Sequence, residues 1–228
     1  MPPLEKLILD NQTLWLSTER CIYWEENQTL IVSDLHFGKT GHFRKSGIGV
    51  PQSIYKEDLQ RLLVQLQHFR PKQLIVVGDF FHSIQNKELD FFLRWRNDFS
   101  DLKIHLVRGN HDILLNEWYE KATIEVADST LRIDNFCFVH DINDLNSNFS
   151  EKMYYFSGHV HPGIQIKGVG KQSISLPCFY FSKHFAILPA FSRFTGYAMV
   201  NKKPLDAIYA IIPANISKGQ HSSIITVK

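Results

Sequence analysis

The fold is decided by the stretch Leu30-Ile31-Val32-Ser33-Asp34-Leu35-His36-Phe37-Gly38. Its apolar first half is typical of a buried parallel strand. Residues two apart in an extended segment point to the same side, so Asp34 and His36 can reach one point just past the strand. A carboxylate and an imidazole are both metal ligands, but an isolated Asp-x-His is more often a helix cap and a loop histidine.

The same pattern returns four times downstream, and this repetition favours a shared site. The apolar runs 74–77, 104–107, 136–139 and 154–156 lead into Gly78-Asp79, Gly109-Asn110-His111-Asp112, His140-Asp141 and Gly158-His159-Val160-His161. Ligands of α/β proteins collect outside the carboxyl ends of the strands. A purely structural explanation would have to account for each coincidence separately. We therefore expect these polar residues to converge.

The remaining pattern predicts an α/β fold. Short strands alternate with turns over residues 6–32, and another strand covers residues 73–78. Pro51 begins a helix that Pro71 must end, and its apolar stripe contains Leu59, Leu62, Leu63 and Leu66. Asn86 is a suitable cap for a second helix. Residues 131–139 predict a hairpin, and the C-terminal third predicts a second sheet packed on the first.

Length and composition indicate one ordinary globular domain over residues 1–228. Hydrophobic residues make up 44% and charged residues 21% of the chain. The formal net charge of +2 is too small to indicate nucleic-acid binding by itself. No apolar run is long enough to cross a bilayer, and the N-terminus lacks the apolar stretch of a signal peptide. We therefore expect a cytoplasmic protein without a membrane partner.

The three cysteines, Cys21, Cys137 and Cys178, predict neither a disulfide framework nor a metal knuckle. They are odd in number and widely spaced, which suits a reducing compartment. Cys137 and Cys178 lie in apolar runs and are predicted to be small core residues.

Taken in order, the strand-end motifs resemble those of the calcineurin-like metallophosphoesterases over residues 33–161. The matching residues are Asp34-x-His36, Gly78-Asp79, Gly109-Asn110-His111-Asp112, His140 and Gly158-His159-x-His161. The resemblance implies a four-layer sandwich, in which two β-sheets pack face to face and are flanked by helices.

The resemblance also implies two divalent metal ions. Asp34, His36, Asp79 and His161 would hold the first ion, and Asp79, Asn110, His140 and His159 the second. The bridging carboxylate of Asp79 suits cations about 3.5–4 Å apart. Four histidines with two carboxylates suit Mn²⁺, Zn²⁺ or Fe better than Mg²⁺, and Mn²⁺ is the expected ion.

Two further residues have predicted catalytic roles. In the family, the histidine that matches His111 stabilises the transition state or protonates the leaving oxygen. Asp112 is either the partner that orients His111 or a cap for a short helix.

Two features bear on the substrate. Gly78-Asp79 is followed by Phe80-Phe81-His82, without the Asp-Arg of protein Ser/Thr phosphatases. A histidine at this offset is similar to the double-strand-break repair nucleases of the superfamily, so His82 is a candidate substrate-site residue. The alternative is a histidine that caps the strand end.

The loop after the first ligands also carries candidate substrate-binding residues, namely Lys39, His42, Arg44 and Lys45, with the aromatic Phe43 among them. Cations beside a phosphate site can hold backbone oxygens, and an aromatic ring can stack on a base. A solvated charged loop is the alternative.

Near the end of the chain, Leu188-Pro189-Ala190-Phe191 and Phe194-Thr195-Gly196 resemble the bacterial ligase-associated DNA damage response endonucleases. Ser192-Arg193 stands where that family more often has glycine. The resemblance implies a DNA endonuclease or 3'-end-processing enzyme in repair, with DNA, a DNA ligase, a helicase and an exonuclease as partners. The alternative enzyme is a phosphodiesterase or pyrophosphohydrolase of small nucleotide or lipid-linked substrates. A non-catalytic scaffold is disfavoured, because the ligand set is complete.

Overall fold

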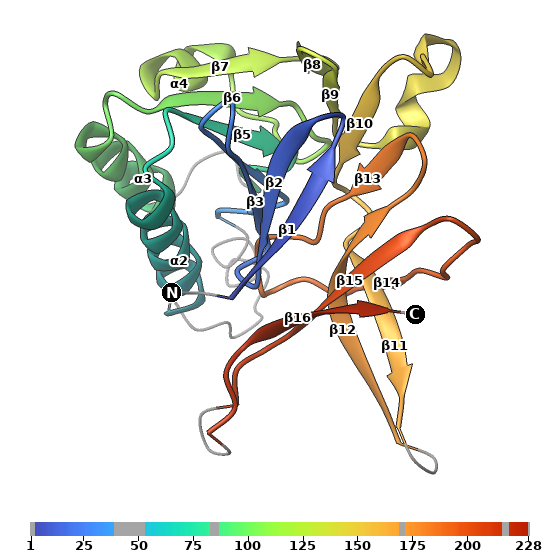
Figure 1. Ribbon diagram of the computed structural model, residues 1–228. Coiled ribbons are helices and arrows are strands. Elements are labelled where there is room, and N and C mark those ends of the chain that lie inside the picture. The colour runs from blue at the N-terminus through green and yellow to red at the C-terminus, as the bar shows by residue number, and fades with distance from the viewer. Residues whose placement is uncertain (1–2, 39–52, 83–86, 169–171, 216–218, 228) are drawn as a thin grey trace.

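The computed structural model describes residues 3–38, 53–82, 87–168, 172–215 and 219–227 (Figure 1). Two β-sheets lie against each other, and helices α2 (Ser53–Phe69) and α3 (Lys87–Asp98) run along the outer side of the first sheet. This arrangement confirms the predicted pair of sheets flanked by helices.

The first sheet has the strands β1 to β7 in sequence order. They are β1 (Leu4–Leu9), β2 (Gln12–Ser17), β3 (Cys21–Trp24), β4 (Thr29–Ser33), β5 (Gln73–Val77), β6 (Lys103–Val107) and β7 (Ile124–Ala127). The first four strands form the predicted antiparallel meander, and β4 to β7 are parallel. Short helix α4 (Asn116–Lys121) lies between β6 and β7.

The second sheet comes from the C-terminal half of the chain and is mixed. Its order is β14 (Ala198–Met199), β11 (Pro162–Lys167), β12 (Ser173–Phe181), β13 (Phe185–Ile187), β10 (Tyr154–Ser157), β9 (Phe136–Val139) and β8 (Thr130–Ile133). Strand β15 (Ala207–Ile212) pairs with β12 and with β16 (Ser223–Val227). The predicted hairpin is confirmed by the antiparallel pair β8–β9.

The burial of strand β4 explains why residues 30–38 begin with an uninterrupted apolar run. Leu30 and Val32 point into the core that the first sheet shares with the helices. Ile31 points the other way, into the core between the two sheets, where it shares a cluster with Phe156. A strand with both faces buried needs apolar residues at consecutive positions. This double burial holds the end of β4, and therefore the residues that follow it, in a fixed place.

The helix α2 on the first sheet agrees with the sequence-based prediction, whereas the second sheet carries a 3₁₀ helix that was not predicted. Leu62 and Leu66 of α2 are buried, and α2 ends before Pro71 as predicted. On the outer side of the second sheet, the 3₁₀ helix η1 (Ile142–Asn148) contributes Leu145 to a small core. Pro51 and the predicted cap Asn86 lie outside the described residues.

All three cysteines are buried free thiols, which confirms the core placement of Cys137 and Cys178. Within the described part of the chain, no helix is both long and apolar enough to cross a membrane.

Candidate metal centre

The predicted ligands lie at the carboxyl ends of strands from both sheets. Asp34 and His36 follow β4, Asp79 follows β5, and Asn110 follows β6. In the second sheet, His140 follows β9 and His159 and His161 follow β10. Strands β4 to β6 are parallel neighbours, as are β9 and β10, so their carboxyl ends share an edge.

Asp34, His36 and His161 form the first cluster, and their ligand atoms lie within 4.8 Å of one another. Nε2 of His161 is 3.5 Å from Nε2 of His36 and 3.4 Å from Oδ1 of Asp34. Asp34 is fully buried and also accepts hydrogen bonds from the backbone N–H of His159. A buried carboxylate beside two imidazoles is a donor set that suits a transition-metal ion.

Asp79, His140 and His159 form the second cluster, and Asp79 also reaches the first. Its Oδ1 is 3.6 Å from Nε2 of His140, while its Oδ2 is 3.8 Å from Nε2 of His36. Oδ1 of Asn110 lies 3.0 Å from Nε2 of His140. The geometry therefore fits the predicted division of seven ligands, with one carboxylate between the two groups.

The backbone at these positions adopts an uncommon conformation. Five of the seven predicted ligands have a positive φ: 51° at Asp34, 51° at His36, 50° at Asp79, 66° at His159 and 50° at His161. Only a few per cent of non-glycine residues adopt positive φ, and such residues gather at functional sites. The abrupt change from extended strand to this conformation turns the side chains toward the shared edge.

Glycines beside the ligands allow the loops to approach closely. Gly78 has a φ of +75°, and a Cβ built there would lie 1.8 Å from Nδ1 of His140. A Cβ at Gly109 would lie 2.3 Å from Oδ1 of Asp79. Any larger residue would push on a ligand side chain, which explains why glycine recurs at the strand ends.

His111 and His82 lie together at the edge of the first cluster. The backbone N–H of His111 donates to Oδ1 of Asp79 at 3.0 Å, and its side chain is 41% exposed. The His82 ring lies 4.2 Å from the His111 ring and 5.5 Å from that of His36, measured between centroids. The structure thus places both predicted substrate-facing histidines beside the clusters.

Asp112 makes hydrogen bonds that differ from both of its predicted roles. Its carboxylate accepts from the backbone N–H groups of Phe80, Phe81 and Gly109, at distances of 2.9–3.0 Å. Burial raises the pKa of Asp112 to about 7, although the hydrogen bonds from Phe81 and Gly109 oppose this rise. The side chain therefore joins the loops after β5 and β6, which carry ligands of both clusters.

Replacing Asp112 with alanine is expected to destabilise the metal-free protein. Each buried donor left without a partner costs about 1–3 kcal/mol of the free energy of unfolding. Asp112→Asn keeps one acceptor oxygen and is expected to lose less. Chemical denaturation measures both variants, with the exposed Asp98→Ala as a matched control. An Asp112→Ala variant as stable as that control would contradict this role.

Two features of the site were not predicted from the sequence. Oδ2 of Asp141 lies 3.8 Å from Nε2 of His159, so this carboxylate is within reach of the second cluster. The backbone N–H groups of Phe191 and Ser192 donate to the carbonyls of Ser33 and Asp34. The adjacency of Asp141 to His140 was a usable signal for the first feature. The second could be suspected only from the resemblance at residues 188–191.

The candidate substrate-binding residues Lys39, His42, Arg44 and Lys45 lie outside the described residues. Their roles stay predictions.

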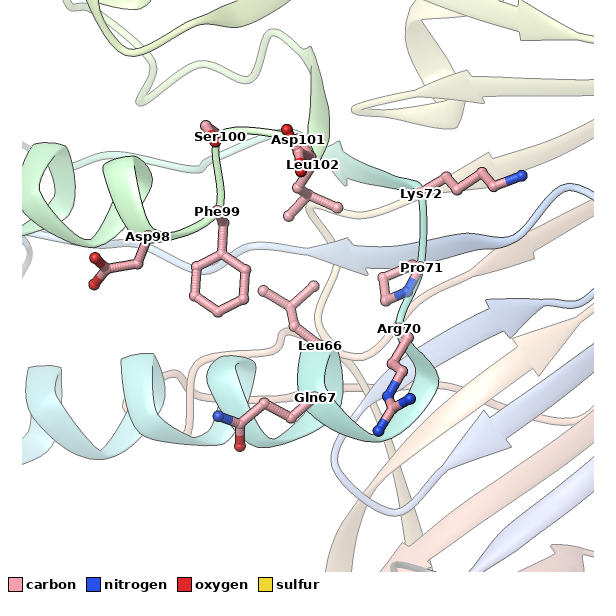
Figure 2. Close-up of a pocket in the computed structure, with 10 residues that line it drawn as sticks. All are labelled: Leu66, Gln67, Arg70, Pro71, Lys72, Asp98, Phe99, Ser100, Asp101 and Leu102. Atoms are coloured by element: carbon pink, nitrogen blue, oxygen red, sulfur yellow. The ribbon is translucent and has the colours of Figure 1, made fainter.

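A cavity of about 660 Å³ lies elsewhere, where α2 and α3 end (Figure 2). Leu66, Phe99 and Leu102 line its apolar part, and Arg70 and Lys72 stand beside it. Lys72 and Leu102 immediately precede β5 and β6, whereas the predicted ligands follow the other ends of the strands. The cavity is therefore separate from the metal centre.

Comparison with known protein families agrees with this geometry. Residues 28–182 match the family described as calcineurin-like phosphoesterase. The chain belongs to this family. It is a metal-dependent phosphoesterase, and the described His and Asp clusters are groups that could hold its divalent metals. A search of the curated proteins finds no match.

Among solved structures, the phosphoesterase is similar to a nuclease. The Pseudomonas putida nuclease MPE is 28% identical with a TM-score of 0.77, over 91% of this chain and 96% of that chain. Two others have a TM-score of 0.43. These are the Aquifex aeolicus protein AQ665, of unknown function (19% identical, 58% of this chain and 78% of that chain), and Yfce, a phosphoesterase from E. coli (14% identical, 87% of this chain and 97% of that chain).

Proposed function

We propose that the phosphoesterase is a two-metal phosphodiesterase that cleaves or trims DNA strands during repair. One observation carries the proposal: the similarity to a nuclease, with 28% identity and a TM-score of 0.77, extends over 91% of this chain. The chain also has mild net charge, so recognition of DNA would rely on residues beside the clusters rather than on bulk charge.

The residues of the centre would hold two metal ions. Asp34, His36, Asp79 and His161 would hold one ion, and Asp79, Asn110, His140 and His159 the other. Bound there, divalent cations supply Lewis-acid stabilisation of the phosphoryl group and lower the pKa of a water. Manganese is the proposed ion, with zinc and iron as alternatives.

His111 is the proposed proton donor. Its backbone N–H donates to the carboxylate of Asp79, and its side chain is 41% exposed, with Nε2 4.0 Å from Oδ2 of Asp79. A proton on its Nε2 can pass to the leaving oxygen of the phosphate, and His82 packs against the ring and limits its movement.

A panel of substrates tests this function. Protein loaded with Mn²⁺ is incubated with a phosphomonoester, bis(4-nitrophenyl) phosphate, a nucleoside pyrophosphate, and single-stranded, duplex and nicked DNA. We expect cleavage of the small diester and of at least one DNA, and no cleavage after chelation. Hydrolysis of the pyrophosphate without cleavage of any DNA would favour the enzyme of small nucleotide or lipid-linked substrates.

We also propose that Lys39, Arg44 and Lys45 contact DNA phosphates. Each phosphate contact with a single strand contributes about −0.7 to the slope of log affinity against log salt. Replacing all three with alanine is expected to flatten that slope by up to about 2. Fluorescence anisotropy at several salt concentrations measures it, and an unchanged slope would show that these side chains do not contact the strand.

A DNA ligase, a helicase and an exonuclease are the proposed partners in the repair reaction. Co-purification of the phosphoesterase with such proteins from its own cells would support this. Activity of the isolated protein on DNA does not depend on it.

A further inference from the structure

The segment 188–199 joins the second sheet to the first metal cluster. Its Leu188 N–H donates to the carbonyl of Ser157, at the end of β10, and its Ser192 N–H donates to the carbonyl of Asp34. Further along, the Ala198 N–H donates to the carbonyl of His161 at 3.1 Å. The segment is thus hydrogen-bonded to the backbones of two predicted ligands of the same metal ion.

The side chains of two arginines donate hydrogen bonds to this segment. Nη1 of Arg20 donates to the carbonyls of Ala190 and Ser192, at 3.2 and 2.8 Å. Nη2 of Arg20 donates to the hydroxyl of Tyr197 at 3.3 Å, and its guanidinium lies over the Tyr197 ring. Nη1 of Arg61 donates to the carbonyl of Phe191. These bonds attach the segment to the first sheet and to α2.

The surface between these anchors is aromatic and exposed. Phe194 and Tyr197 are each 36% exposed, and Met199 is 49% exposed. The Arg193 side chain, which is 54% exposed, precedes Phe194 in the chain and pairs with Glu19. A Cβ at Gly163 would lie 2.6 Å from the Cβ of Tyr197, so the glycine lets Tyr197 pack directly on β11. Rigid aromatic faces beside guanidinium groups are the elements with which proteins bind single-stranded nucleic acids.

We infer that Phe194 and Tyr197 form a stacking surface for unpaired bases of the DNA strand that is being cleaved. The inference rests on the proposed function and specifies how that site recognises its substrate. The strand's phosphate would lie at the metal clusters, and its neighbouring bases would cover the two rings. Stacking does not depend on base identity, because every base has a π-face. The enzyme would therefore select strand ends or unpaired regions rather than a sequence.

The experiment compares the affinity of the protein for an oligonucleotide that carries bases with its affinity for one that lacks them. The Mn²⁺-loaded protein is titrated against two fluorescent single-stranded oligonucleotides with phosphorothioate linkages that slow cleavage. One carries normal bases and the other is abasic at the same length and charge. Wild type is expected to bind the base-bearing strand about 5- to 150-fold more tightly for each stacked base. Tyr197→Ala is expected to lose most of this preference.

Two matched variants separate stacking from structure. Tyr197→Phe removes the hydroxyl bonded to Arg20 but keeps the ring, so it is expected to keep the preference for bases. Phe91→Ala removes an aromatic that is 50% exposed on α3, on the opposite side of Figure 1 from β14, and is expected to behave as wild type.

Equal binding of both strands by wild type would overturn the inference, whatever happens to the variants. So would a Tyr197→Ala variant that loses affinity equally for both strands, or a Tyr197→Phe variant that loses the preference. The proposed function is tested separately by the substrate panel. If it is wrong, the wild-type protein will cleave none of the DNA substrates in a metal-dependent way.

Discussion

Asp79→Asn is expected to remove both metal ions and, with them, nearly all phosphoesterase activity. Oδ1 of Asp79 faces His140 and Oδ2 faces His36, so this one side chain serves both clusters. Loss of a residue that hydrogen-bonds to a metal ligand typically lowers metal affinity by about 10- to 100-fold. Loss of a ligand shared by two ions should therefore lower it by at least about 100-fold. Elemental analysis after loading with Mn²⁺ measures metal content, and bis(4-nitrophenyl) phosphate measures the rate.

Asp141→Asn is the matched control for that experiment. Oδ2 of Asp141 lies 3.8 Å from Nε2 of His159, which belongs to the second cluster, so loss of this carboxylate is expected to weaken the second cluster and spare the first. If Asp79→Asn retained two ions per chain, Asp79 would not be the bridging ligand. If Asp141→Asn lost both ions, the two clusters would not be separable in the way the distances indicate.

His111→Ala is expected to keep both metals and lose about 10²- to 10⁴-fold in turnover, the usual contribution of a positioned general acid. The side chain is partly exposed, and the backbone N–H that donates to Asp79 is retained in the variant. Turnover and metal content are measured on the same preparation.

Substrates with different leaving groups sharpen the test of His111. A 4-nitrophenolate leaving group needs little protonation, whereas an alkoxide such as a deoxyribose oxygen needs much more. The loss should therefore be larger on DNA than on the chromogenic diester. A parallel fall in metal content would instead make His111 a ligand. His82→Ala, which removes the neighbouring ring, is expected to have a smaller effect.

The sequence was sufficient to predict which strand ends bring the candidate ligands together. Burial on both faces of β4 imposes consecutive apolar residues, and the parallel order of β4, β5 and β6 brings the residues that follow them to one edge. Both features can be recognised in the sequence, as apolar runs and as the polar residues that follow them. The same holds for the meander and for the hairpin of β8 and β9.

The role of Asp112 could not be predicted in the same way. Its three hydrogen-bond donors are backbone amides, and two of them belong to a loop more than 30 residues away. Any residue except proline can supply an amide, so no residue type identifies the partner. The position of segment 188–199 is similarly hidden, because its bonds to Ser33, Asp34 and His161 join backbone groups.

The left-handed backbone of the predicted metal ligands links the metal site to the folding of the whole domain. Residues in such conformations cost about 1–3 kcal/mol each and persist only where surrounding structure enforces them. Five predicted ligands are held this way, so packing between the sheets maintains their spacing. The ligand geometry should therefore persist on heating until the packing between the two sheets is lost. Loss of activity and unfolding of the sheets should then occur over the same temperature range.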